Sequence, residues 1–351
     1  MFFNFSSLEI LVILAISSFV FTIILQPYIV KLGNKLQIID SPSPRKQKKK
    51  SLVRIGGIAL IFGYFVSLII LFSLTDLNTL SKNNLLILFI SSFSIFLLGL
   101  IDDLKNISPF IRLFIQILIS IGVWNAGIKI DSINVTWINV PIIELNRVIS
   151  LFLTSIWIVG ITNAINWMDG LDGLASGITG LASLGISTLA FQNGQFFEAY
   201  LSIILAGCCF GFLRLNFFPA KILMGDGGSY FIGFNIAFIS LLTITTKINP
   251  IGLFAPILTL IIPIFDMSYV MYTRLSRGKS PFLADRGHIH HRLIKLGFSE
   301  LGSVVYLYGL TQLFTVIAIC LGSSDNGIYI IFLLGSFFMS FFTFILAKKV
   351  L

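Results

Sequence analysis

Long apolar runs separated by short polar stretches dominate the chain. Each run has about 17–23 residues, the length of an α-helix that crosses the hydrocarbon core of a bilayer. The first run has no basic region before it and no small-residue cleavage site after it, so it is predicted to be retained. Eleven spans are predicted, at residues 8–30, 55–74, 85–101, 109–126, 147–164, 174–191, 199–215, 229–246, 251–273, 301–322 and 328–347. The expected fold class is an all-α polytopic membrane protein, with residues 1–351 as one integral membrane domain.

Composition confirms that most of the chain lies in lipid, and the distribution of charge predicts which loops face the cytoplasm. Only 11% of the residues are charged, against about 25% in soluble domains, so lipid must solvate most of the surface. With the N-terminus outside, 20 of the 24 Lys and Arg residues fall in loops on one side. Cytoplasmic loops carry such an excess, so this side is predicted to face the cytoplasm. Topology therefore explains the formal charge of +9 without nucleic acid. The other side holds only Lys82, Lys129, Arg147 and Lys247.

The loop at 127–146 is the one long loop on the predicted outer side. Residues 129–137 alternate weakly between apolar and polar, which predicts a small periplasmic β-hairpin near 129–140. Cys208, Cys209 and Cys320 lie in apolar runs, and their spacing indicates neither a disulfide framework nor a metal site.

Polar clusters that suggest chemistry gather on the predicted cytoplasmic side. Asp102 and Asp103 follow the third apolar run directly. Adjacent carboxylates repel each other unless a cation or a raised pKa relieves them. Taken alone, the pair is explained equally well as ordinary charge at the membrane surface.

A second cluster follows the fifth run and combines acids, amides and glycines. Glycine lets the backbone approach a ligand closely, and the oxygens of Asp and Asn suit Mg²⁺, a ribose or a base edge. A calcium-binding EF-hand is excluded because the later ligands and the terminal Glu are missing. The polar members are Asn163, Asn166, Asp169 and Asp172.

A third cluster places Asp226 in a glycine turn just before the eighth run, with Asn216 at the start of the same loop. Exposed N–H groups in such a turn suit phosphate oxygens, and the carboxylate suits a hard cation. A plain turn at a span boundary would explain the glycines, but it explains the acid less well.

All three histidines, His288, His290 and His291, share one loop with Asp285 and Arg286. A zinc site would lack cysteine and a clear fourth ligand. Histidine and arginine together fit a diphosphate and its developing negative charge better.

The first cytoplasmic loop is strongly basic and includes Lys50 and Arg54. Docking on anionic lipid and recruitment of a phosphorylated lipid and a nucleotide both remain open for it. Asp266 lies inside the ninth run, and an acid within a span is by default functional or paired. The sequence does not identify its partner.

In order and spacing, these clusters resemble the polyprenyl-phosphate N-acetylhexosamine-1-phosphate transferase family, in its WecA/TagO-like branch, over nearly the whole chain. The resemblance implies that Asp102, Asp103, Asp169 and Asp172 are catalytic. It also implies that Asp226 binds Mg²⁺, with Mn²⁺ as a substitute. The substrate-binding residues that it implies are Lys50, Arg54, Asn163, Asn166, Asn216, Arg286, His288, His290 and His291.

The implied reaction transfers a HexNAc 1-phosphate, preferably of GlcNAc, from a UDP-sugar to undecaprenyl phosphate. It releases UMP and begins a lipid-linked glycan of the bacterial cell surface. The implied partners are both substrates and membrane lipid, without nucleic acid, and the oligomeric state stays open between monomer and homodimer. Direct attack and a covalent aspartyl-phosphate route both fit.

Two other functions remain open as alternatives. The first is the phospho-MurNAc-pentapeptide transferase of peptidoglycan synthesis, which the same resemblance allows. The second is a secondary transporter, whose polar site would lie near the bilayer midplane, often between repeated halves. This chain has its acids at one face and no evident repeat, which favours the enzyme.

Overall fold

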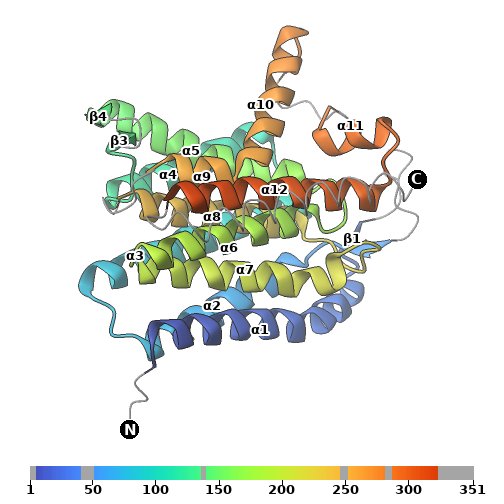
Figure 1. Ribbon diagram of the computed structural model, residues 1–351. Helices are drawn as coiled ribbons and strands as arrows, with labels where there is room; N and C mark the ends of the chain where they lie inside the picture. Colours follow the sequence, from blue (N-terminus) through green and yellow to red (C-terminus); the bar gives the residue numbers. More distant parts are fainter. Residues whose placement is uncertain (1–4, 41–50, 136–139, 246–251, 281–286, 323–351) are drawn as a thin grey trace.

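The computed structural model describes residues 5–40, 51–135, 140–245, 252–280 and 287–322, which form a bundle of helices (Figure 1). An all-α polytopic fold is thereby confirmed, while the predicted span at 328–347 lies outside the described residues. A further apolar helix, α4 (Pro109–Asn125), is shorter. Within the described residues, eight helices are long and apolar enough to cross a membrane: α1 (Ser7–Lys35), α2 (Gly57–Leu74), α3 (Thr79–Lys105), α5 (Arg147–Met168), α6 (Leu174–Gln192), α7 (Phe196–Asn216), α8 (Gly225–Thr245) and α12 (Glu300–Gly322).

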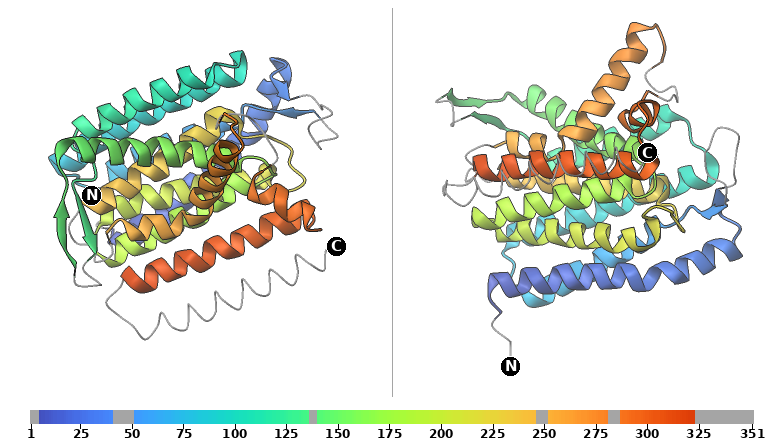
Figure 2. Two further views of the ribbon diagram at one scale, coloured as in Figure 1. Left: turned by 90° about the horizontal axis from the view of Figure 1, so that it is seen from above. Right: turned by 45° about the vertical axis from the view of Figure 1, so that its right-hand side comes forward.

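Two short antiparallel strand pairs lie at opposite ends of the bundle (Figures 1 and 2). Strand β1 (Ile39–Asp40) pairs with β2 (Leu52–Val53). Strand β3 (Ser132–Val135) pairs with β4 (Val140–Glu144). The second pair confirms the hairpin predicted near 129–140, and its periplasmic location stays a prediction.

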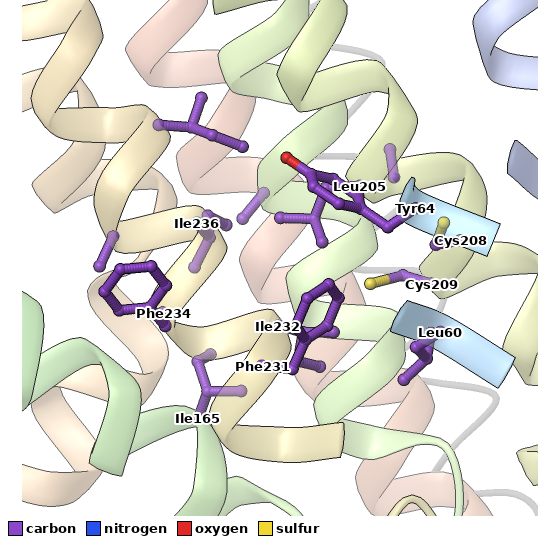
Figure 3. Packing of buried hydrophobic residues seen from close by; sticks show 14 of the residues in the cluster. Leu60, Tyr64, Ile165, Leu205, Cys208, Cys209, Phe231, Ile232, Phe234 and Ile236 are labelled. Carbon is purple, nitrogen blue, oxygen red and sulfur yellow. The ribbon is translucent and has the colours of Figure 1, made fainter. Parts of the chain in front are cut away.

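Helix α8 lies at the centre of the bundle and is buried along nearly its whole length. It packs against α2, α3, α5, α6 and α7. Its Phe231 meets Tyr64 of α2 edge to face, with ring centroids 5.5 Å apart, and Ile165 of α5 belongs to the same core (Figure 3). Protein rather than lipid therefore surrounds the polar residues in the first turn of α8.

Local sequence sets where several helices begin. Ser6 and Glu9 form a capping box at the start of α1, and the side chains of Asn78 and Asn146 each accept a backbone N–H at the starts of α3 and α5. Such caps satisfy N–H groups that have no partner inside the helix. Helix α4 begins at Pro109, a position where proline's missing N–H costs nothing.

The ninth predicted span, 251–273, is not one continuous helix. It is divided into α9 (Phe254–Thr259) and α10 (Ile261–Ser276). Pro263 has no N–H to donate to the Thr259 carbonyl, and its ring clashes with that carbonyl, so the helix restarts. Helix α10 then leaves the bundle steeply (Figures 1 and 2).

Gly99 lets α3 lie directly against the first turn of α8. A Cβ at position 99 would lie 2.4 Å from the carbonyl oxygen of Asp226. We expect Gly99→Ala to destabilise the protein by about 1–3 kcal/mol, because backbone rather than a flexible side chain must move. Gly122→Ala in α4 is the matched control, since a Cβ there meets nothing within 4 Å. Thermal unfolding in detergent measures both, and equal midpoints would contradict the close approach.

Candidate active site

Polar side chains from four segments meet at one end of the bundle. Asp102 and Asp103 stand in the last turn of α3, Asn166 in the last turn of α5 and Asp226 in the first turn of α8. Arg54 lies between β2 and α2. The hydrogen bonds among these residues place all four segments at the same face of the bundle. This is the end that carries β1, away from the β3–β4 hairpin (Figure 1).

Arg54 bridges two of these carboxylates. Its Nε lies 2.9 Å from Oδ1 of Asp103, and its Nη2 lies 2.9 Å from Oδ2 of Asp226. Burial acts to lower the pKa of the guanidinium, but the two carboxylates outweigh it and the net shift of the pKa is upward. Arg54 therefore stays charged and offsets the mutual repulsion of the acids.

Backbone pairing holds Arg54 between the two loops that it connects. The N–H of Leu223 donates to the Val53 carbonyl at 2.8 Å, and the N–H of Gly56 donates to the Leu223 carbonyl at 2.9 Å. Gly56 is required for this approach, because a Cβ there would lie 2.4 Å from the Leu223 carbonyl oxygen. The loop before α2 and the loop before α8 are thus fixed to each other.

Asp103 caps α8 from a different helix. Its Oδ1 accepts the N–H of Asp226 at 2.9 Å, and its Oδ2 accepts the N–H of Gly227 at 3.0 Å. Those N–H groups have no partner within α8. With Arg54 as a third partner and a side chain only 1% exposed, Asp103 is placed to position Asp226. The direct catalytic role predicted for Asp103 stays a prediction.

Asp226 is the accessible carboxylate of this cluster, with 23% of its side chain exposed. Its Oδ1 accepts a hydrogen bond from Nδ2 of Asn166 at 2.9 Å. Among the residues that the structure describes, no group of three or more His, Cys, Asp or Glu would hold a metal by itself. A single exposed carboxylate fits Mg²⁺, which often takes one or two carboxylates together with water and substrate phosphates.

Asp102 is held by Arg112, in the first turn of α4. Its Oδ2 pairs with Nη1 of Arg112, and its Oδ1 accepts the N–H of Ile107 at 2.8 Å. Arg112 also donates to the hydroxyl of Tyr230 at 3.2 Å. The exposed ring of Phe110 lies in the same turn of α4. The pair therefore stands where the polar site meets the lipid-facing surface.

Two further predicted residues support the loop before α8, Asp172 from the segment after α5 and Asn216 from the end of α7. Oδ2 of Asp172 accepts the N–H of Ala220 at 2.9 Å. Asn216 is 2% exposed, donates to the Ile222 carbonyl at 3.0 Å and accepts from the Ser176 hydroxyl at 3.1 Å. Asn216 thus supports the loop that carries Asp226, and its predicted contact with substrate stays a prediction.

Asn163 and Asp169 lie on either side of Asn166. Asn163 stands one turn deeper in α5 and donates to Oε1 of Gln116 in α4 at 2.6 Å. Asp169 ends α5, and its N–H donates to the Asn166 carbonyl at 3.1 Å. The structure therefore brings Asp169 beside Asn166, the amide that contacts Asp226, whereas Asn163 joins α5 to α4.

Asp266 of α10 is the partner of the histidine segment at α11 (Ile289–Lys295). Its Oδ2 lies 2.8 Å from Nδ1 of His288, and its Oδ1 accepts the N–H of Ile289 at 2.6 Å. The rings of His288 and His290 stack, with centroids 5.6 Å apart and planes 9° apart. The sequence left the partner of Asp266 unidentified, and this contact supplies it.

The histidine segment docks against the end of α5. A Cβ on Gly170 would lie 2.4 Å from Nε2 of His290, so the glycine makes room for that ring. Trp167 lies edge-on to His288 with centroids 5.7 Å apart, and the ring of His291 lies 4.4 Å from that of His290. Two clusters that are far apart in the sequence thus form one surface.

Burial of His290 gives the protein a testable acid sensitivity. The pKa of His290 is lowered to about 3, chiefly by burial and also by His291 and His288, while Asp266 opposes the shift. The unfolded chain has a histidine pKa of about 6.5. As the pH falls from 6.5 toward 3, the unfolded state binds a proton that the folded state does not, so stability is lost. This difference in proton binding at His290 lowers the free energy of unfolding by about 2 kcal/mol at pH 5 relative to pH 8. We expect His290→Gln to reduce the pH dependence of thermal unfolding, and identical dependence would contradict the burial.

Lys50 and Arg286, both predicted to bind substrate, lie outside the residues that the structure describes. Two residues that belong to the site, Arg112 and Tyr230, were not predicted from the sequence. In the sequence, Arg112 is only one of the basic residues that mark topology. A short connection between α3 and α4 was the available signal, because it turns the chain back and brings Arg112 to Asp102.

Comparison with known proteins covers the same segments. The model of glycosyl transferase family 4 matches residues 85–244, which include Asp102, Asn166 and Asp226. The chain is 33% identical over 326 residues to the probable undecaprenyl-phosphate N-acetylglucosaminyl 1-phosphate transferase of Bacillus subtilis, covering 92% of this chain and 89% of that protein. It is 30% identical to the decaprenyl-phosphate N-acetylglucosaminephosphotransferase of Mycobacterium leprae, over 79% and 75%. It is also 30% identical to the undecaprenyl-phosphate alpha-N-acetylglucosaminyl 1-phosphate transferase of Escherichia coli, over 81% and 77%.

Proposed function

Because the chain belongs to glycosyl transferase family 4, we propose that it transfers N-acetylglucosamine 1-phosphate from UDP-N-acetylglucosamine to undecaprenyl phosphate. Membership confirms the resemblance read from the order of the motifs. The observation that carries the proposal is the convergence of Asp102, Asn166 and Asp226 at one face of the bundle, in a chain similar over 92% of its length to a relative named for such a transfer.

The proposed location is the bacterial cytoplasmic membrane, with the site facing the cytoplasm. In the topology predicted from the sequence, loops on the site's side carry 20 of the 24 Lys and Arg residues. Such an excess is typical of cytoplasmic loops. A nucleotide sugar is soluble and a lipid phosphate is fixed at the surface, so a site at the membrane face can meet both.

The nucleophile is an oxygen of the lipid phosphate. It attacks the phosphorus that bears the sugar, and the bond from that phosphorus to the UMP oxygen breaks with its electron pair leaving on UMP. A phosphate monoester is largely dianionic at pH 7, because its second pKa is about 6. Direct attack therefore needs no strong base. It is also favoured because Asp102 is already engaged by Arg112 and by the N–H of Ile107.

The proposed roles of the surrounding residues follow from their contacts. Arg112 orients the lipid phosphate, since a guanidinium matches phosphate oxygens well. Asp226 is the proposed ligand of Mg²⁺, which when bound supplies positive charge to the diphosphate and the departing UMP. Asn166 fixes the orientation of that carboxylate through its Nδ2 hydrogen bond. Arg54, with 30% of its side chain exposed, can exchange one carboxylate for a substrate phosphate.

The test measures UMP release by purified protein in detergent. We expect release only when UDP-N-acetylglucosamine, undecaprenyl phosphate and Mg²⁺ are all present, with one labelled sugar in the lipid product for each UMP. EDTA should stop the reaction and excess Mg²⁺ should restore it. Turnover with UDP-MurNAc-pentapeptide alone would reassign the donor. Absence of turnover with every UDP-sugar, from folded protein, would overturn the proposal.

A further inference from the structure

A cavity of about 420 Å³ lies at the end of the bundle opposite the candidate active site. Helix α5 links the two, from Arg147 at the cavity to Asn166 at the site. That separation of 19 residues corresponds to about 28 Å along a helix, close to the thickness of a hydrocarbon core. The cavity is lined by residues that include Trp124, Asn125, Lys129, Asp131, Arg147 and Ser150.

Two cations share the ring of Trp124 in this cavity. The Lys129 Nζ lies 5.4 Å from the ring centroid, and the Arg147 Cζ lies 5.2 Å from it. The ring is fixed, because it is 7% exposed and its N–H donates to the Ser150 hydroxyl at 3.0 Å. Like charges gathered at one ring repel each other. An anion between them would turn that repulsion into attraction.

The cavity's own carboxylate balances only one of the two cations. Asp131 lies 3.1 Å from Lys129 Nζ, accepts from Ser150 at 3.3 Å and has a side chain that is 60% exposed. Arg147 has no carboxylate within salt-bridge distance in the part of the chain that the structure describes. It also occupies the first position of α5, where the positive end of the helix disfavours a cation.

Membrane topology adds a second cost to these cations. In the topology predicted from the sequence, only four of the 24 Lys and Arg residues fall on this side, and two of them line the cavity. Basic residues are disfavoured on the side opposite the cytoplasm. Neighbouring Val148 and Phe152 of α5 are 76% and 64% exposed. Such apolar exposure beside the cavity is suited to acyl chains rather than to water.

We propose that this cavity binds the phosphate of an anionic phospholipid headgroup in the leaflet opposite the active site. The phosphate lies between Lys129 and Arg147 and accepts hydrogen bonds from both. The acyl chains follow the exposed apolar side chains of α5. This site is independent of the transfer reaction proposed above.

The experiment titrates delipidated, purified protein with phosphatidylglycerol in detergent and counts bound lipid by native mass spectrometry. We expect Arg147→Gln and Lys129→Gln each to weaken binding by about fivefold, the contribution of one basic residue near an anionic surface. Lys82→Gln is the matched control, because Lys82 is on the same side and lies 6.0 Å from the ring centroid of Phe72 but away from the cavity. The control should bind as the wild type does.

Equal binding of phosphatidylglycerol by wild type and both cavity variants would overturn the proposal. Equal retention of phosphatidylcholine and phosphatidylglycerol by the wild type would do the same, because no anion would then be recognised. Displacement of the lipid by inorganic phosphate as effectively as by glycerophosphoglycerol would assign the cavity to a soluble anion and overturn the lipid assignment. Unfolding temperatures check that each variant is folded, and either cavity variant alone suffices for the test.

Discussion

Asp226→Asn is expected to lower kcat by about 10³-fold while the protein stays folded. The substitution keeps the shape of the side chain and an oxygen that can accept from Asn166 Nδ2, so the local packing survives. It removes the negative charge proposed to hold Mg²⁺ and the charge that pairs with Arg54 at 2.9 Å. A loss of 10³-fold corresponds to about 4 kcal/mol of transition-state stabilisation, within the range for preorganised charge in a site.

UMP release under saturating substrates measures the effect, and Mn²⁺ binding followed by electron paramagnetic resonance gives a readout that does not depend on turnover. Asp76→Asn is the control, because Asp76 is an exposed carboxylate in the connection between α2 and α3, away from the site. It should retain wild-type kcat and Mn²⁺ affinity. A folded Asp226→Asn protein with kcat within about threefold of wild type would remove Asp226 from the proposed metal site.

The helices were predictable because apolar runs of membrane length leave few other structures open to the chain. The break at Pro263 was not, since proline is tolerated inside spans when neighbouring groups satisfy the freed backbone. Hydropathy averages over the whole window at 251–273 and does not register one lost hydrogen bond. The hairpin at β3 and β4 was predictable because residues 129–137 alternate, although weakly, in a loop between two apolar runs.

The site was predictable in its members but not in its pairings. The resemblance implied a catalytic role for Asp103 and a metal-binding role for Asp226, but it did not show that Asp103 is buried as a cap of α8 while Asp226 stays partly exposed. Arg54 joins both, across 49 positions of sequence to Asp103 and 172 positions to Asp226. Such contacts depend on how helices pack, which periodicity alone does not encode. The contact between Asp266 and His288 could not be predicted for the same reason.

Asp266→Asn is expected to lower kcat/KM by about 10–100-fold, a typical loss when a residue that orients a functional histidine is removed. The carboxylate of Asp266 only accepts hydrogen bonds, so Nδ1 of His288 must carry the proton. Nε2 is then the nitrogen left for substrate. An asparagine can accept from the Ile289 N–H with its oxygen, and its NH2 group then faces Nδ1 of His288 as a donor, which favours the tautomer with the proton on Nε2. The ring would lose its fixed tautomer.

A spectroscopic readout separates this role from a merely structural one. The chain contains three histidines, so selective ¹⁵N labelling of histidine gives a spectrum with few signals, and His288→Gln assigns one of them. We expect the His288 signal of the wild type to show a protonated Nδ1, and that of Asp266→Asn to show an exchanged or mixed tautomer. Asp266→Glu, which keeps an acceptor-only group, should restore the tautomer and part of kcat/KM.

The same Asp→Asn substitution is therefore expected to act differently at Asp226 and at Asp266. At Asp226 the missing charge is what matters, so loss of metal binding should accompany loss of kcat and the histidine spectrum should stay unchanged. At Asp266 the missing acceptor is what matters, because both of its oxygens serve protein donors and its side chain is 2% exposed. Metal affinity should there remain within about threefold of wild type while the tautomer and kcat/KM change together. If Asp266→Asn left the His288 signal and kcat/KM as in the wild type, Asp266 would not be required to orient His288 and would contribute to packing only.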